Sequence, residues 1–150
     1  MLRLASPLGN ALLKVVSGQN PREIAAEVLA RRYGSAPNRA VFVEDILDQA
    51  LIATQLSALD RSLCQELVYG VVRWQPTLDW LISRKTSRKP DKPLLVHLLR
   101  LGLYQIFWLS RIPNHAAVNE TVEIAKRKGL KSQAGFINAV LRGFLRDFVR

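Results

Sequence analysis

The stretch Gly135-Phe-Ile-Asn-Ala-Val-Leu-Arg142 begins the last expected helix of this chain, and Arg111-Ile-Pro-Asn-His-Ala-Ala-Val-Asn-Glu-Thr-Val122 leads into the helix before it. In the earlier stretch, Ile112-Pro113 predicts a break, because the residue before a proline avoids the helical conformation. A helix should follow over about 114–128 and end at Gly129, since glycine is the usual residue at a helix end. These stretches predict two consecutive helices.

The last of these helices is strongly amphipathic. Arg142, Arg146 and Arg150 lie four residues apart on the face opposite its apolar stripe. The apolar side chains of the stripe are Ile137, Val140, Leu141, Phe144, Leu145 and Phe148. This spacing predicts a helix with one buried face and one basic face.

The rest of the chain also has helical periodicity, and no segment alternates as a strand does. Asn20 can cap the first helix and Pro21 suits its first position, while Ser57 with Asp60 resembles a capping box. Pro76 interrupts the pattern, so a separate short helix is expected after it. The expected helices here run from Pro21 to about Tyr33, over 43–54, from Ser57 to Pro76, around 78–82 and over about 93–109. Gly70, inside the third, should allow close packing.

Length and composition indicate one globular domain. The chain has 150 residues, 49% of them hydrophobic, enough for a core of its own. The ordered domain is expected over 20–150, after an N-terminal tail over 1–19 with a marginal helix near 8–16. We expect an all-α bundle of about seven helices.

Several functional classes are excluded by residue content. Cys64 is the only cysteine, and His97 and His115 are the only histidines, so an internal disulfide and the common zinc sites are excluded. The longest apolar run, 94–109, is shorter than a membrane helix requires and contains polar residues. The N-terminus lacks a signal-peptide core. We expect a cytoplasmic protein that binds neither a membrane nor a metal.

Charge is concentrated in the second half. Residues 1–75 hold 8 Lys/Arg and 7 Asp/Glu, a net charge of +1, whereas residues 76–150 hold 14 and 5, a net charge of +9. This bias favours a polyanionic partner, and a nucleic acid more than an anionic membrane. The alternative is a basic protein with solvated lysines.

Five motifs in order carry a resemblance over residues 20–147. They are the two stretches quoted first and Asp60-Arg-Ser-Leu-Cys-Gln-Glu-Leu-Val-Tyr-Gly-Val-Val-Arg73, Leu78-Asp-Trp-Leu-Ile82 and Leu101-Gly-Leu-Tyr-Gln-Ile106. The chain resembles the NusB fold, and most closely the N-terminal NusB-like domain of bacterial ribosomal RNA cytosine-C5 methyltransferases of the RsmB, Sun or Fmu type.

The resemblance implies a seven-helix bundle in two subbundles that binds structured ribosomal RNA. In the complete methyltransferases a Rossmann-like domain follows, which binds S-adenosylmethionine and attacks the pyrimidine with cysteines. This chain shows no strand pattern and no glycine-rich loop for that cofactor. We therefore expect a domain that is not an enzyme in isolation, either a fragment of a methyltransferase or a solitary domain.

Four groups of basic residues are candidates for RNA phosphates. Standalone NusB proteins contact RNA through an arginine-rich start to the first helix, where this chain offers only Arg22. The 84–92 loop and the 126–131 cluster are therefore the preferred candidates. The RNA-binding candidates are Arg22, Arg31, Arg32, Arg84, Lys85, Arg88, Lys89, Lys126, Arg127, Lys128, Lys131, Arg142 and Arg146, with Lys92 and Arg150 beside them.

Structural roles explain the other reactive-looking residues. Cys64 lies by an apolar stripe without an activating partner, so a core role is expected. His97, His115 and Asn138 are expected to pack or to hydrogen-bond nearby backbone. The aromatic residues Tyr69, Trp74, Trp80, Tyr104 and Trp108 could stack on bases if exposed, but their aliphatic neighbours favour the core, least clearly for Trp74 and Phe42.

Two hypotheses remain open. The first is a non-catalytic RNA-binding domain that positions ribosomal RNA for a methyltransferase, and it predicts a contiguous basic surface over the last three helices and the 84–92 loop. The second is a protein-interaction module. It would dock on its own catalytic domain, or act like NusB with a NusE-like ribosomal protein in transcription antitermination, and it predicts an exposed apolar patch.

Overall fold

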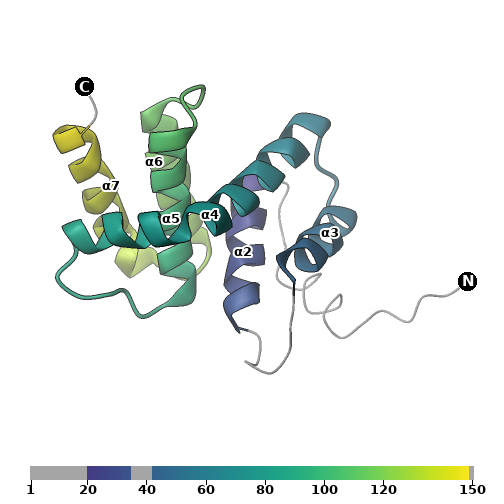
Figure 1. Ribbon diagram of the computed structural model, residues 1–150, viewed down its shortest axis with the longest axis horizontal. Coiled ribbons are helices and arrows are strands. Elements are labelled where there is room, and N and C mark those ends of the chain that lie inside the picture. Colours follow the sequence, from purple (N-terminus) through teal and green to yellow (C-terminus); the bar gives the residue numbers. More distant parts are fainter. Residues whose placement is uncertain (1–19, 35–41, 149–150) are drawn as a thin grey trace, which may run out of the picture. The chain divides into compact units, whose positions relative to one another are not determined.

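The computed structural model describes residues 20–34 and 42–148, and this part of the chain is all-helical, as predicted (Figure 1). It contains six α-helices and one short 3-10 helix. They are α2 (Pro21–Gly34), α3 (Val43–Ala53), α4 (Ala58–Lys85), α5 (Pro93–Trp108), α6 (Asn114–Arg127), η1 (Lys131–Gln133) and α7 (Ala134–Phe148). The expected tail over 1–19 and Arg150 lie outside the described residues.

The chain divides into two compact units, with the boundary between Val68 and Tyr69 inside α4. We call them the N-terminal unit and the C-terminal unit. The N-terminal unit contains α2, α3 and the beginning of α4. The C-terminal unit contains the rest of α4 and the helices from α5 to α7.

In the N-terminal unit, side chains cap the starts of α2 and α4, as predicted, whereas α3 begins without a side-chain cap. The side-chain oxygen of Asn20 accepts hydrogen bonds from the backbone N–H groups of Arg22 (2.9 Å) and Glu23 (3.3 Å) at the start of α2. The hydroxyl oxygen of Ser57 accepts one from the N–H of Asp60 (3.2 Å) at the start of α4. Such caps satisfy N–H groups that have no partner within the helix.

The predicted apolar stripe of α3 is confirmed, and α3 packs against α2. Its buried residues are Val43, Ile46, Leu47, Ala50 and Leu51. The hydroxyl of Thr54 donates a hydrogen bond to the carbonyl oxygen of Ala50 (2.9 Å), beside the end of the helix. Burial of one helical face therefore holds α3 in place.

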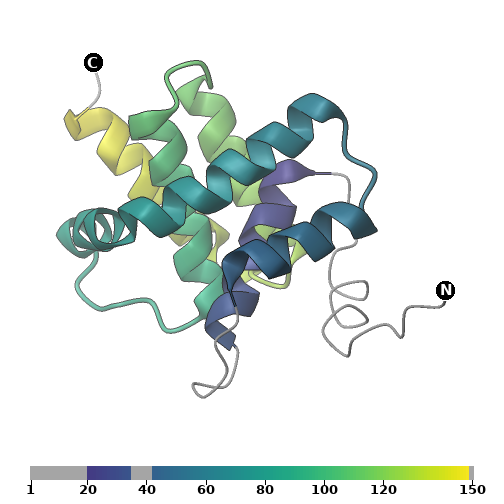
Figure 2. The same ribbon diagram turned by 45° about the vertical axis from the view of Figure 1, so that its right-hand side comes forward.

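In the C-terminal unit, α5 is the central helix. Every residue from Leu95 to Ile106 is buried, as expected from its apolar run. Helix α5 packs against α6 and α7, and Figure 2 shows these helices close together with the second part of α4 running across them.

Two glycines permit these close packings. Tyr104 of α5 occupies the space that a side chain at Gly70 of α4 would need. A Cβ atom at Gly102 would lie 2.7 Å from the Cδ1 atom of Leu141 on α7. The role predicted for Gly70 is confirmed, since even alanine would overlap its neighbour.

The break predicted at Pro76 is wrong, because α4 continues through it to Lys85. Proline lacks the N–H group that would bond to the carbonyl four residues earlier. The exposed Pro76 is flanked along the helix by Val71, Leu78 and Ile82, which are buried. Packing of these residues therefore outweighs the lost hydrogen bond, and the expected third and fourth helices are one.

The loop before α6 and the end of that helix agree with the predictions. Helix α6 begins at Asn114, directly after Pro113, and ends at Arg127. Gly129 follows with a φ of 80°, a left-handed conformation that glycine adopts without a steric penalty. The burial predicted for Phe148 is wrong: its side chain is 63% exposed, because it lies at the last turn of α7, beyond the buried Phe144.

Candidate nucleic-acid interface

A first basic cluster forms where the last turn of α4 meets the last turn of α7. The ammonium group of Lys85 donates a hydrogen bond to the carboxylate of Asp147. Its nitrogen also lies 5.7 Å from the ring centroid of Phe144 and 5.6 Å from that of Phe148. Arg146 pairs with Asp147 at 3.4 Å. We call Arg84, Lys85 and Arg146 the α4–α7 basic cluster.

Asp147 is the counterion of this cluster. The hydrogen bond from Lys85 is the main reason that the pKa of Asp147 lies below its ordinary value of 3.8, with a smaller contribution from Arg146. Asp147 therefore stays ionised near neutral pH. Its single carboxylate then faces two cations, Lys85 and Arg146. Positive charge remains in excess at this end of α7.

Arg88 and Lys89 line a pocket in the loop between α4 and α5. The pocket has a volume of about 370 Å³ and lies among Asp79, Ile82, Ser83, Thr86, Ser87, Arg88, Lys89, Pro90 and Val96. Its lining combines three hydroxyl groups, two cations, one carboxylate and three apolar side chains. Such a mixture suits a ligand with an anionic group.

A second basic cluster lies at the end of α6 and in η1. Lys126, Arg127 and Lys131 are exposed and Lys128 is half-buried. Lys126 pairs with Glu123 at 3.2 Å, with both side chains largely in solvent. We call these four cations the α6–η1 basic cluster. Helix α7 follows directly, so this cluster lies beside its first turn.

The two clusters lie at opposite ends of α7. The helix has 15 residues, which corresponds to a length of about 22 Å. Exposed Arg142 lies one turn before Arg146, and its Nε donates a hydrogen bond to the side-chain oxygen of Asn138 (2.9 Å). The bond expected from Asn138 to a loop backbone is thus replaced by a surface contact on its own helix.

Arg22, Arg31 and Arg32 belong to α2 of the N-terminal unit and are half-buried. The same helix carries the buried Glu23 and Glu27. The described residues of this unit include four Lys/Arg and seven Asp/Glu, a net charge of −3. Arg22, Arg31 and Arg32 therefore lie in an acidic unit, whereas the other RNA-binding candidates lie in the basic C-terminal unit.

Buried polar residues have structural partners. Arg100 binds Asp79 through two hydrogen bonds, Nε to Oδ1 at 2.7 Å and a terminal nitrogen to Oδ2 at 2.9 Å. Its other terminal nitrogen lies 3.3 Å from Nδ1 of the buried His97. A bidentate pair of this kind fixes α4 against α5. The core role predicted for His97 agrees with this position, whereas His115 is exposed.

Cys64 is fully buried, as predicted. Burial raises the pKa of its thiol to about 12, so the thiolate is scarcely formed at neutral pH. Among the residues that the structure describes, no group of three or more His, Cys, Asp and Glu could hold a metal ion. No helix within these ranges is both long and apolar enough to span a membrane.

The expected burial of two aromatic residues on α4 is wrong. Trp80 is 59% exposed and Tyr69 is 42% exposed, whereas Tyr104 is buried. A sequence signal could have indicated this: Tyr69 and Trp80 are eleven residues apart, so they share a helical face. That face is the one opposite Leu67, Val71 and Leu78.

Comparison with known protein families identifies the family of this chain. The NusB family matches residues 19–146 of the chain. The chain belongs to the NusB family. NusB from T. maritima has a similar fold, with a TM-score of 0.75 over 98% of this chain and 96% of that one. The two sequences are 20% identical, so this likeness concerns the fold alone.

Named relatives confirm the resemblance to methyltransferase-associated NusB domains. The probable ribosomal RNA small subunit methyltransferase B of Synechocystis sp. is 44% identical over 110 residues, which cover 72% of this chain and 25% of that protein. The Bacillus subtilis protein with the same description is 38% identical over 130 residues, covering 85% and 28%. This NusB-family chain therefore spans about a quarter of the length of these relatives.

Proposed function

We propose that this NusB-family domain binds structured ribosomal RNA and positions it for the catalytic domain of a cytosine-C5 methyltransferase. The observation that carries the proposal is the charge of the C-terminal unit. Its described residues include fourteen Lys/Arg and five Asp/Glu, a net charge of +9. Asp79, Glu123 and Asp147 each pair with a cation of this unit. Cations outnumber carboxylates by nine, so the unit as a whole attracts a polyanion.

The arrangement of this charge suits a folded RNA. The α4–α7 and α6–η1 basic clusters lie near the two ends of α7, about 22 Å apart, and the exposed Arg142 lies between them. Lysine and arginine on phosphates fix the position of an RNA without reading its sequence. Recognition by shape is the usual mode for structured RNA.

In this proposal, another part of a longer protein would carry out the methyl transfer. The relatives named methyltransferase are about four times as long as their matched segments. In the ranges described here no strand precedes a glycine-rich loop, so these residues form no Rossmann-type pocket for S-adenosylmethionine. We infer that the cofactor and the catalytic cysteines belong to that other part.

The proposal is tested by fluorescence anisotropy with a labelled small-subunit ribosomal RNA hairpin at two salt concentrations. Binding should weaken steeply with salt and exceed binding to a DNA duplex of equal length. The triple variant Lys126→Ala, Arg127→Ala, Lys128→Ala should bind more weakly. Its salt dependence should fall by about one unit of slope for each lost phosphate contact.

A matched control separates position from total charge. Gln55→Glu, Ala58→Glu and Ser62→Glu lie at exposed positions of the N-terminal unit and lower the net charge by the same three units. This control should bind almost as well as the wild type. If both triple variants lose the same RNA affinity, binding depends on total charge and not on the position of the clusters. If the wild type does not bind the RNA at low salt, the proposal is refuted.

A protein-docking role is the second candidate, and one observation favours it. Ile52 and Leu59, on either side of the α3–α4 connection, are 79% and 84% exposed. Both belong to the N-terminal unit, away from the basic clusters in sequence. A catalytic domain or a NusE-like ribosomal protein would be its partner, and a failure of RNA binding in the test above would make it the leading function.

A further inference from the structure

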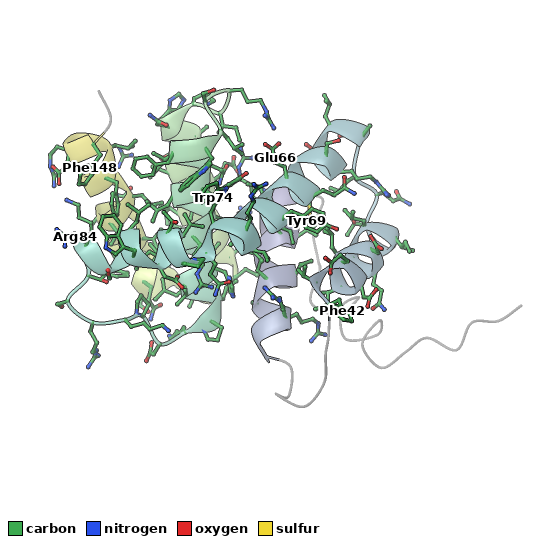
Figure 3. The ribbon with its side chains drawn as sticks, in the orientation of Figure 1. Phe42, Glu66, Tyr69, Trp74, Arg84 and Phe148 are labelled. Carbon is green, nitrogen blue, oxygen red and sulfur yellow. The ribbon has the colours of Figure 1, made fainter. Side chains whose placement is uncertain are left out.

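The outward face of α4 in the C-terminal unit carries aromatic and arginine side chains in alternation. Tyr69, Arg73, Trp80 and Arg84 are separated by four, seven and four residues, so they lie on one helical face. All four are exposed. They extend over fifteen residues of helix, a length of about 22 Å. Figure 3 shows Tyr69, Trp74 and Arg84 in order along this helix.

The core of the unit does not account for these exposed rings. The opposite side of the helix is already occupied by Leu78 and Ile82, which are buried. Tryptophan is usually largely buried in a folded protein, yet Trp80 is 59% exposed. Tyrosine and tryptophan are enriched at binding interfaces, because each combines a large apolar ring with a polar group.

Each arginine lies over a tryptophan ring. The guanidinium carbon of Arg84 is 5.6 Å from the centroid of Trp80, and that of Arg73 is 5.8 Å from the centroid of Trp74. Trp74 in turn contacts Trp108 at 5.4 Å between ring centroids. These contacts restrain the aromatic side chains, so less conformational entropy is lost when a ligand binds.

The positive charge of this face favours a nucleic acid over an uncharged protein as its partner. Asp79, the carboxylate on the same stretch of α4, is already bound to Arg100 at 2.7 and 2.9 Å. Arg73 and Arg84 therefore give the face a positive character. Exposed rings interleaved with cations match a ligand that has flat π faces and a phosphate backbone. An uncharged protein partner would not require the arginines.

We infer that this face of α4 is a stacking platform for unpaired nucleotides of RNA. Bases stack on Tyr69 and Trp80, and Arg73 and Arg84 contact the adjoining phosphates. The inference rests on the proposed RNA-binding function and adds that single-stranded segments are held at this face. Paired segments lie on Lys85 and Arg146 of the α4–α7 basic cluster and on the α6–η1 basic cluster.

The test compares a short labelled oligouridylate with an RNA duplex of equal length, again by fluorescence anisotropy on the full chain. Trp80→Ala should weaken binding of the oligouridylate about tenfold, as expected for loss of one stacked base. Duplex binding should be almost unchanged. Trp80→Phe should recover most of the affinity while losing much of the RNA-induced quenching of tryptophan emission.

Ile52→Ala is the matched control, because Ile52 is also an exposed apolar side chain but lies in the N-terminal unit. It should leave both affinities unchanged. If Trp80→Ala and Ile52→Ala bind the oligouridylate equally well, the inference is refuted and the face belongs to a protein partner. A wild-type chain that binds duplex but not oligouridylate would also refute it. Failure to bind either RNA would overturn the proposed function as well.

Discussion

The N-terminal and C-terminal units of this chain are both helical, yet their described residues have net charges of −3 and +9. In the N-terminal unit seven carboxylates exceed four cations, and in the C-terminal unit fourteen cations exceed five carboxylates. The charge of the whole chain, +10, conceals this difference. The proposed RNA-binding role therefore rests on the charge of the C-terminal unit rather than on the average composition.

Two of the three helices that begin in the N-terminal unit have a side-chain cap, whereas α3 of that unit and α5 and α6 of the C-terminal unit have none. In the N-terminal unit, Asn20 and Ser57 cap α2 and α4 with side-chain oxygens. In the C-terminal unit, α5 starts with Pro93 after Lys92, which makes no side-chain cap. Proline at the first position needs no N–H partner. The basic unit thus holds its helices by packing and by the pair between buried Arg100 and half-buried Asp79.

The largest expected effect concerns that pair. Asp79→Ala would leave Arg100, whose side chain is 6% exposed, without its counterion. We expect a loss of about 3 kcal/mol in the free energy of unfolding, measured by urea denaturation followed by circular dichroism. The double variant Asp79→Ala, Arg100→Met should lose clearly less, because it removes the uncompensated charge. Equal losses would mean that the pair does not stabilise the C-terminal unit.

A smaller effect is expected at the helix caps. Asn20→Ala should reduce the free energy of unfolding by about 1 kcal/mol, since two backbone N–H groups of α2 lose their acceptor. Lys92→Ala is the matched control in the C-terminal unit and should have almost no effect. The same urea titration serves both variants. A control as destabilised as Asn20→Ala would contradict the proposed difference between the units.

The smallest effect concerns the surface pair between Lys85 and Asp147. The pKa of Asp147 is lowered in the folded state, so ionised Asp147 stabilises the fold above its unfolded pKa. That contribution disappears as the pH falls through the lower folded pKa. Asp147→Asn should therefore be slightly less stable than the wild type near neutral pH and equally stable in strong acid. A difference that persists in acid would assign the effect to packing instead.

Local patterns predicted most of the fold. The stripe of α3, the caps at Asn20 and Ser57 and the end of α6 before Gly129 all depend on residues within a few positions of one another. The basic candidates were also visible as charge. Their grouping was not, because Lys85 and Asp147 are 62 residues apart in the sequence.

The errors have a common cause. Pro76 has a local preference against helix, and Trp80 and Phe148 have a preference for burial. Each outcome was instead decided by tertiary packing. Residues on both sides of Pro76 are buried against other helices, which keeps α4 continuous, and no core remains beyond Phe144 to cover Phe148. A local pattern contains no information on how far the core extends.

The sequence by itself determined the all-helical class, the NusB-family membership and the basic second half, because helical periodicity, motif order and charge are properties of neighbouring residues. Only the tertiary structure decided which cations meet and which aromatic side chains face solvent. The contact of Lys85 with α7 and the exposure of Trp80 on α4 depend on packing between helices that are distant in the chain. Burial of apolar surface, which is not a local property, selects that packing.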